Sequence, residues 1–242
     1  MTTPVIVTGA SAGIGAAIAR HLGSAGHDLV LTYRTRKEPA LDLVADIERA
    51  GGRAIALRTD VSIRTDIRSV FDAAETAFGP AYALVNNAGV AKVRTIADST
   101  DNLIEELLGA NLLGTLYGMQ EAATRLLEGG AIVNISSTAV QTATPGLGVY
   151  LAAKSGVETL TRVAAKEFGA RRIRVNSVAP GLIDSPMFRD GKTDADLERF
   201  TAQAPLRRLG SNEEIAAAVA YLLHPDASWV NGQVLRVNGG VA

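Results

Sequence analysis

The sequence contains no cysteine, and this absence excludes several kinds of site at once. Disulfide frameworks, thiolate nucleophiles, and zinc or iron–sulfur centres with cysteine ligands all need that residue. The three histidines, His21, His27 and His224, are spaced unlike metal ligands. We therefore expect no metal site, and any catalysis must use other side chains.

Long apolar runs and an excess of charge of one sign are also missing. The longest wholly apolar run, Ile215 to Leu223, is far shorter than the roughly 20 residues of a membrane-spanning helix. The first residues show no basic segment followed by an apolar one, which a secretory signal would have. With 24 Lys and Arg against 25 Asp and Glu, the chain has no general attraction for nucleic acid or anionic lipid. We expect a cytoplasmic protein that binds neither nucleic acid nor membrane.

The chain instead alternates short β-branched segments with longer Ala- and Leu-rich segments of helical periodicity. This alternation is typical of β-α units around a parallel sheet. Because 242 residues can bury one large core and no linker interrupts them, we expect one domain, residues 1–242. The expected strands span 5–8, 28–33, 53–58, 81–86, 131–136, 173–178 and 233–237. The expected helices lie near 13–25, 38–50, 64–78, 101–128, 150–170 and 211–223.

The least regular stretch covers residues 182–205. It begins Leu-Ile-Asp-Ser-Pro-Met-Phe-Arg-Asp-Gly-Lys and continues as a charged amphipathic segment. We interpret it as a mobile lid over the substrate or an insert.

A glycine-rich turn follows the first expected strand directly. The sequence Thr8-Gly9-Ala10-Ser11-Ala12-Gly13-Ile14-Gly15 leads into an Ala-rich helix. Glycine allows a diphosphate to lie close against the N–H groups of a helix start, where a Cβ would obstruct it. The spacing G-x3-G-x-G differs from the general G-x-G-x-x-G pattern, and the turn lacks the Gly-Lys-Ser/Thr ending of a P-loop. An ordinary strand-helix turn is the alternative, but the position after the first strand favours dinucleotide binding.

The end of the second expected strand indicates which dinucleotide binds. An acidic residue there would accept hydrogen bonds from the ribose of NAD, whereas a basic one pairs with the 2′-phosphate of NADP. Here the strand is followed by Arg34-Thr35-Arg36-Lys37, a segment with three cations and no carboxylate. This favours NADP(H) over NAD(H), with Arg34 as the leading contact. A solvated basic turn is the alternative.

Two further polar positions follow the third and fourth expected strands. Asp60 could meet the adenine edge, because ligands of open α/β sheets bind at the carboxyl ends of strands. The turn Asn86-Asn87-Ala88-Gly89 could hold the central sheet together and also lie next to the cofactor. Turn capping by Asn86 and Asn87 is an equally good interpretation.

Tyr150 and Lys154 lie four residues apart in an expected helix, so their side chains would share one face. A Lys154 ammonium would favour the phenolate and lower the pKa of Tyr150, which could then exchange a proton with an alcohol or carbonyl oxygen. The same spacing occurs at Tyr33 and Lys37, so it is a weak signal alone. What distinguishes Tyr150 is Ser137, thirteen residues earlier at the end of the fifth expected strand.

Ser137 and Asn111 would complete this reaction centre. The Ser137 hydroxyl could hold the substrate oxygen near Tyr150 while nicotinamide C4 exchanges hydride with the carbon. Asn111, inside the expected helix near 101–128, could fix a water that connects Lys154 with solvent. An asparagine bonded to helix backbone is the equal alternative.

In this order the motifs closely resemble those of the short-chain dehydrogenase/reductase family, over essentially the whole chain. They are the glycine-rich turn, Asp60, Asn86-Asn87-Ala88-Gly89, Asn111, Ser137, Tyr150-x3-Lys154, Pro180-Gly181, and Gly232-Gln233 with Val237-Asn238-Gly239-Gly240. The resemblance implies an α/β, Rossmann-like fold: a doubly wound, parallel, seven-stranded sheet with helices on both faces. It also implies an Asn-Ser-Tyr-Lys catalytic set in which Tyr150 is the acid and base.

The resemblance further implies that Lys154 holds the nicotinamide ribose and that Ile183 and Ser185 approach the carboxamide. Relatives are usually tetramers built on two long helices, here near 101–128 and 150–170, which implies a homotetramer. Ala12 departs from the basic residue of many NADP-dependent relatives, and Asn238 from a frequent Asp. The cofactor-binding residues expected in all are Gly9, Ser11, Gly13, Ile14, Gly15, Arg34, Asp60, Val61, Asn87, Ala88, Gly89, Tyr150, Lys154, Pro180, Gly181, Ile183 and Ser185.

Two functions follow from these residues. The first is an NADP(H)-dependent oxidoreductase that interconverts a ketone and a secondary alcohol, similar in pattern to 3-oxoacyl-[acyl-carrier-protein] reductases. The alternative is a dinucleotide-binding sensor or regulator without chemistry; its usual sign, loss of the Tyr or Lys, is absent. The substrate would be a small carbonyl or alcohol compound, and an acyl carrier protein is a candidate partner. Arg125, Arg171 and Arg172 could attract that acidic carrier or have a structural role.

Overall fold

The computed structural model describes all residues except 1, 2, 190 and 192, and all side chains among them except those of 186 and 187. Its strands form one sheet in the order β3-β2-β1-β4-β5-β6-β7, and every pairing between them is parallel. The predicted parallel, seven-stranded α/β sheet is confirmed. The strands are β1 (Val5–Val7), β2 (Asp28–Tyr33), β3 (Arg53–Arg58), β4 (Ala83–Asn86), β5 (Ala131–Ile135), β6 (Arg174–Pro180) and β7 (Val234–Val237).

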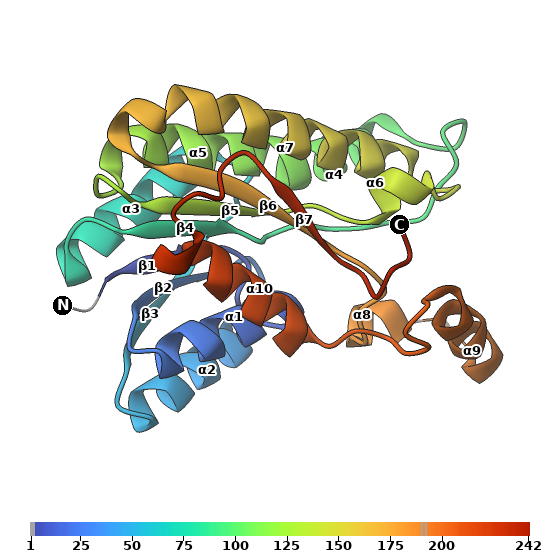
Figure 1. Ribbon diagram of the computed structural model, residues 1–242, viewed down its shortest axis with the longest axis horizontal. Coiled ribbons are helices and arrows are strands. Elements are labelled where there is room, and N and C mark those ends of the chain that lie inside the picture. Colours follow the sequence, from blue (N-terminus) through green and yellow to red (C-terminus); the bar gives the residue numbers. More distant parts are fainter. Residues whose placement is uncertain (1–2, 190, 192) are drawn as a thin grey trace.

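Helices cover both faces of this sheet (Figure 1). On one face lie α1 (Gly13–Ser24), α2 (Lys37–Arg49) and α10 (Asn212–Leu223); on the other lie α3 (Arg64–Phe78), α4 (Asp101–Leu108), α5 (Gly114–Arg125) and α7 (Gly148–Glu167). Because successive strand residues point to opposite faces, β1 contributes Val5 and Val7 to one core and Ile6 to the other. This double burial explains why β1 is wholly apolar and why β4 and β5 are apolar apart from Asn86 and Asn134.

The strand order reverses direction between β1 and β4. The chain builds outward from β1 to β3, then returns to the other side of β1 and builds β4 to β7. In open α/β sheets such a reversal leaves a crevice beyond the carboxyl ends of the two central strands, where ligands bind. The glycine-rich turn after β1 and the Asn86–Gly89 turn after β4 therefore lie side by side at this crevice.

The long helix expected near 101–128 is not continuous. It consists of α4, a π-helical turn η1 (Gly109–Leu113) and α5. A π turn inserts one extra residue into the helical repeat and is frequently found at functional sites. Asn111 lies within this turn, which the apolar periodicity of the sequence could not reveal.

The stretch 182–205 contains two short helices, α8 (Pro186–Arg189) and α9 (Asp194–Gln203). The rings of Phe188 and Phe200 pack edge to face between them, with centroids 5.4 Å apart. Residues 190 and 192 of the predicted lid lie outside the described residues. The other short elements are α6 (Ala139–Thr142), η2 (Gly169–Arg171) and η3 (Pro225–Ala227). None of the helices described here combines the length and apolar character needed to cross a bilayer.

Candidate active site

The glycine-rich turn after β1 owes its shape to packing against the turn after β4. A Cβ at Gly9 would lie 2.8 Å from Ala88 Cα, and one at Gly15 would lie 2.5 Å from Asn87 Nδ2. Both glycines therefore allow the two turns to touch. Gly13 differs: its φ is +55°, and the nearest atom to an added Cβ is Asn212 Oδ1 at 3.8 Å.

The start of α1 is open to an anion. Ala12 is the N-cap residue and provides no side-chain hydrogen bond to the first N–H groups of the helix. These groups need an acceptor, and the helix dipole favours a negative one. The free space beside Gly13 and the uncapped start of α1 together fit the diphosphate of a dinucleotide. When bound, a nicotinamide dinucleotide supplies the hydride chemistry that no side chain can.

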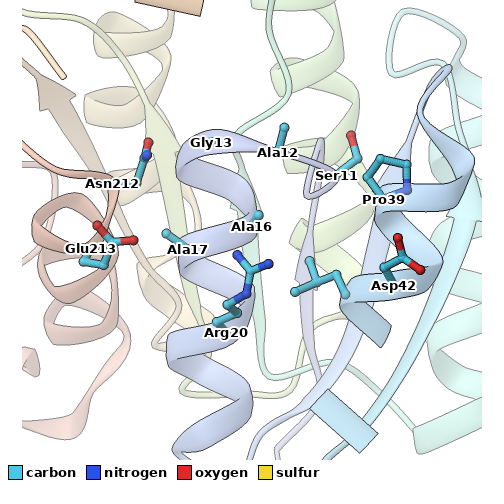
Figure 2. A pocket seen from close by; sticks show the side chains of 11 residues that line it. Ser11, Ala12, Gly13, Ala16, Ala17, Arg20, Pro39, Asp42, Asn212 and Glu213 are labelled. Atoms are coloured by element: carbon cyan, nitrogen blue, oxygen red, sulfur yellow. The ribbon is translucent and has the colours of Figure 1, made fainter. Parts of the chain in front are cut away.

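A hollow of about 320 Å³ runs along the first turns of α1, between α2 and α10 (Figure 2). Its upper rim is the glycine-rich turn itself, so it adjoins the expected diphosphate position. None of the residues lining it belongs to the predicted catalytic set, so this hollow is not the reaction centre. The lining residues are Ser11, Ala12, Gly13, Ala16, Ala17, Arg20, Pro39, Asp42, Leu43, Asn212 and Glu213.

Arg34 and Asp60 lie together at the ends of β2 and β3. Arg34 Nε is 3.0 Å from Asp60 Oδ2, while 56% of the Arg34 side chain stays exposed. Burial acts to raise the pKa of Asp60, but hydrogen bonds from Ser62 and the charges of Arg34 and Arg58 lower it below its usual value. The carboxylate is thus ionised and pairs with Nε of the guanidinium, while more than half of the Arg34 side chain remains exposed. This geometry leaves Arg34 able to meet a phosphate group.

The two asparagines after β4 tie protein segments together. Asn86 is buried and donates to Asn134 Oδ1 of the neighbouring strand at 2.9 Å. The Asn87 amide donates to Thr8 O at 2.8 Å and to Gly9 O at 3.1 Å. Asn86 thus holds two central strands together, as one interpretation expected, and Asn87 ties its turn to the glycine-rich turn; neither of these bonds is turn capping.

Gly89 brings this turn to the reaction centre. A Cβ at Gly89 would lie 2.5 Å from Asn111 Oδ1 and 3.5 Å from Lys154 Nζ. Any larger residue would therefore displace Asn111. Val61, also expected near the cofactor, is buried beneath α5, where a Cβ at Gly114 would meet its Cγ2 at 2.8 Å. Its side chain belongs to the core, and Ile14 likewise packs against the opposite core.

Ser137, Tyr150 and Lys154 come together as the sequence predicts. Ser137 follows β5, whereas Tyr150 and Lys154 lie one turn apart on α7. The Ser137 hydroxyl lies near the Tyr150 hydroxyl, as a hydrogen-bonding neighbour that favours the phenolate, and it accepts from Ala139 N at 3.2 Å. Lys154 is buried, its Nζ donates to Ile135 O at 2.7 Å, and it lies 5.8 Å from the centre of the Tyr150 ring. An acid, a hydroxyl donor and a cation thus share one site.

Burial dominates the protonation of this site. It raises the pKa of Tyr150, with the hydrogen bond to Ser137 acting in the opposite direction, and it lowers the pKa of Lys154 to about 8. The pKa of Tyr150 is therefore raised and not lowered as predicted, because burial dominates. Removal from water disfavours both the Tyr150 phenolate and the Lys154 ammonium. The Lys154 ammonium donates its hydrogen bond to a backbone carbonyl and not to the phenol.

Asn111 bonds to backbone. Its amide donates to Val90 O at 2.8 Å and to Leu107 O at 2.9 Å, and its Oδ1 accepts from Val90 N at 3.2 Å. The side chain thereby fastens the π turn to the segment after β4. These contacts match the backbone-bonded interpretation, and the expected water link to Lys154 stays a prediction.

The segment after β6 is held against the carboxyl-terminal residues. Gly181 N donates to Val237 O at 2.9 Å, and a Cβ at Gly181 would lie 2.6 Å from Asn238 Cα. Asn238 in turn accepts from Gly240 N and donates to Ala242 O, so this departure from the family pattern closes a local turn. Ile183 is buried and bridges to Gly210, while Ser185 Oγ accepts from Phe188 N at the start of α8.

Two partners of the site are backbone atoms that sequence reasoning missed. Ile135 O receives the Lys154 hydrogen bond, and Val90 pairs with Asn111 through both its N–H and its carbonyl. Every residue type carries these groups, so no motif could have identified them. Across the described part of the chain, no three His, Cys, Asp or Glu side chains cluster as metal ligands would.

Comparisons with known proteins agree with this geometry. The family model described as enoyl-(acyl carrier protein) reductase matches residues 9–242. A short-chain type dehydrogenase/reductase of Picea abies is 39% identical over 97% of this chain and 90% of its own length. The 3-oxoacyl-[acyl-carrier-protein] reductase of Staphylococcus aureus is 35% identical over 100% of this chain and 98% of its own.

A solved structure extends the likeness to three dimensions. The blue fluorescent protein from a metagenomic library, determined in complex with NADPH, superposes with a TM-score of 0.94 at 34% identity. The match covers 99% of this chain and 98% of that one. Fold, motif order and relatives agree: the chain belongs to the short-chain dehydrogenase/reductase family, an oxidoreductase family that acts on CH–OH groups with a nicotinamide dinucleotide.

Proposed function

We propose that this protein is an NADP(H)-dependent oxidoreductase that interconverts a ketone and a secondary alcohol. The observation that carries the proposal is the grouping of the Ser137 and Tyr150 hydroxyls beside the buried Lys154. These groups form one catalytic domain with the phosphate-binding turn, and residues 182–205 act as its substrate lid. Asn111 completes the set by holding the segment that borders Lys154.

In the direction of reduction, Tyr150 donates its proton to the carbonyl oxygen while hydride reaches the carbonyl carbon. The raised pKa of Tyr150 keeps the phenol protonated at neutral pH, so the acid is ready when substrate binds. Ser137 holds the oxygen in reach of the phenol. With a pKa of about 8, Lys154 is mostly an ammonium at neutral pH and stabilises the tyrosinate that forms. In oxidation each proton moves the opposite way.

The preference for NADP(H) over NAD(H) is supported by Arg34. Its guanidinium is half-exposed at the end of β2, and that strand end carries no carboxylate of its own. Asp60 supplies one, but it leaves more than half of the Arg34 side chain exposed. A relative's structure contains NADPH, which agrees with the proposal. Ala12 adds no cation, so the preference depends on Arg34.

Contacts of the basic residues favour a free small molecule as substrate. Arg125 is only 18% exposed and pairs with Asp72, Glu75 and Glu121. Arg171 donates to Ala123 O and Leu126 O, and Arg172 pairs with Glu128. These cations have partners within the chain, so an acidic carrier protein would have to displace them.

Reduction of a 3-oxoacyl thioester is the second candidate. It is favoured by the 35% identity to a 3-oxoacyl-[acyl-carrier-protein] reductase over the whole chain. The proposal also includes a cytoplasmic homotetramer built on α4–α5 and α7, for which the partly exposed Leu113 and Val163 offer apolar contacts. A sensor without chemistry is disfavoured because Ser137, Tyr150 and Lys154 are assembled.

The test is to measure NADPH oxidation with acetoacetyl thioesters, β-ketoesters, aldehydes, aldoses and steroids. We expect turnover of at least one ketone, and Tyr150→Phe should lower its kcat by about 10²- to 10⁴-fold, the usual contribution of a general acid. The variant should bind NADPH as the parent does, measured by coenzyme fluorescence. Parental turnover by folded, coenzyme-loaded Tyr150→Phe would contradict the proposal.

A further inference from the structure

A stripe of polar side chains faces the sheet along α7. Lys154, Glu158 and Thr161 follow one another at helical spacing, and they are 4%, 7% and 0% exposed. The other buried residues of this helix are apolar: Ala153, Val157, Ala164 and Ala165. Charged side chains are rarely this buried unless they are paired. The position of each one therefore needs a reason.

Each member of the stripe bonds to one of three consecutive residues at the end of β5. Thr161 Oγ1 accepts from Asn134 Nδ2 at 2.9 Å, and Lys154 Nζ donates to Ile135 O at 2.7 Å. Glu158 Oε1 accepts from the Ser136 hydroxyl at 2.8 Å. Sliding α7 along the sheet would break all three bonds together. The stripe thus determines how α7 is placed on β5.

Glu158 is the one member whose partner adjoins a catalytic residue. Ser136 precedes Ser137 directly, and its N–H donates to Val178 O of β6 at 2.7 Å. Ser136 is therefore held by the sheet through its backbone and by α7 through its hydroxyl. The next residue, Ser137, lies beside Tyr150 of the same helix. Two adjacent serines at the strand end thus meet one helix at positions two turns apart, and Ser136 is hydrogen-bonded to it.

A buried carboxylate is costly, and an apolar residue would fill the same place more cheaply. This unfavourable burial is explained if the hydrogen bond of the carboxylate fixes the relative position of catalytic groups. Ser137 and Tyr150 must both reach one substrate oxygen, and small displacements of such groups reduce catalysis strongly. The contact between Glu158 and Ser136 is placed to prevent that displacement.

We propose that Glu158 is a positioning residue: by holding Ser136, it sets the distance between the Ser137 and Tyr150 hydroxyls in the reactive complex. The inference rests on the proposed function, because it assigns work to Ser137 and Tyr150. Glu158 itself touches neither substrate nor coenzyme. Its removal should therefore lower kcat and leave coenzyme affinity unchanged.

The experiment compares Glu158→Met, Glu158→Gln, Ser136→Ala and the Glu158→Met/Ser136→Ala double variant. Glu167→Gln serves as the control, since it removes an exposed carboxylate from the same helix. Glu158→Met and Ser136→Ala should each lower kcat about tenfold or more, with NADPH dissociation constants within about twofold of the parent. Glu158→Gln should stay near the parental kcat, because its amide oxygen can accept from Ser136. The double variant should be no slower than the slower single one, because both remove the same contact.

Parental kcat in folded Glu158→Met, or losses that multiply in the double variant, would overturn the inference. Should Glu158→Met fail to fold, Ser136→Ala decides by the same criterion. Tyr150→Phe, measured in parallel, separates this inference from the proposed function. If Tyr150→Phe is inactive and Glu158→Met is not, only the positioning role fails; if Tyr150→Phe is active, the proposed function itself fails.

Discussion

The two ends of the crevice at the carboxyl edge of the sheet use different groups: backbone atoms at one end and side chains at the other. The phosphate end consists of backbone: glycines that let two turns touch, and the uncapped N–H groups of α1. Arg34, the side chain expected to meet the 2′-phosphate, is more than half exposed. The reacting end consists of side chains: Lys154 is buried, Ser137 and Tyr150 are partly buried, and removal from water shifts the pKa values of Tyr150 and Lys154.

The two ends are therefore sensitive to different kinds of substitution. Backbone sites fail when a side chain intrudes, because the turn cannot move without breaking its packing. Buried side-chain sites fail when a group is removed, and they cost stability while they are intact. The predictions below test this contrast, beginning with the largest effect.

Gly9→Val should cause the largest loss. Gly9 has a φ of +68°, which β-branched residues rarely adopt, and its Cβ would meet Ala88 Cα at 2.8 Å. Both turns would have to move, so we expect NADPH affinity to fall about a hundredfold or more, together with thermal stability. Isothermal titration and thermal unfolding measure the two effects.

The matched control is Gly26→Val. Gly26 also has a positive φ, +87°, but no atom lies within 4 Å of its added Cβ. This variant should lose stability from backbone strain and keep the parental NADPH affinity. If both variants lose affinity equally, the close approach of the two turns is not what binds the coenzyme.

Lys154→Met should reveal the stability cost of the reacting end. The pKa of Lys154 falls from 10.5 to about 8 in the folded protein because burial disfavours the ammonium. Between these pH values the unfolded chain binds more protons, so the parent gains stability as pH rises through this window. Relative to Lys154→Met, the parent should therefore gain about 2–3 kcal/mol of unfolding free energy from pH 7.5 to pH 10.

Denaturant unfolding at both pH values measures this change. Lys166→Met removes an exposed lysine from the same helix but keeps Lys154, so its unfolding free energy should show the same pH dependence as that of the parent. An equal pH dependence in parent and Lys154→Met would mean that Lys154 titrates normally and that burial does not control the site.

Arg34→Ala should have the smallest effect, because its guanidinium is solvent-screened and already paired with Asp60. We expect about tenfold weaker NADPH binding, the scale of one charge-assisted contact, and nearly unchanged NADH binding. Titration of both coenzymes measures the ratio. The control is Arg36→Ala, which removes a cation from the N-cap position of α2 and should leave the ratio of NADPH to NADH affinity unchanged. An unchanged ratio in Arg34→Ala would show that Arg34 does not bind the 2′-phosphate.

Much of the fold was predictable because it depends on local patterns. All seven strands lie within two residues of their expected bounds, since apolar and β-branched residues dominate most of them and turn signals separate them from the helices. The π turn at Asn111 was not predictable. Helical periodicity over 101–128 is nearly the same with or without one inserted residue, and the insertion is stabilised by contacts with Val90, far away in the chain.

The candidate site divides in the same way. Residue types and spacing were enough to select Ser137, Tyr150 and Lys154, because few side chains can exchange protons and three of them in order form a recognisable pattern. The roles of Asn86, Asn87 and Arg125 stayed open until their partners were known. The identity of a polar residue in the sequence does not show whether its side chain contacts a cofactor, a backbone carbonyl or a carboxylate.

By itself, the sequence determined the order of strands and helices, the glycines that a phosphate can approach, and the chemical groups available for reaction. Only the tertiary structure decided the environment of those groups: which are buried, which are paired, and in which direction their pKa values move. The physical reason is that propensity and periodicity act within one segment. Burial and charge pairing arise between segments such as α7 and β5, which meet only when the chain has folded.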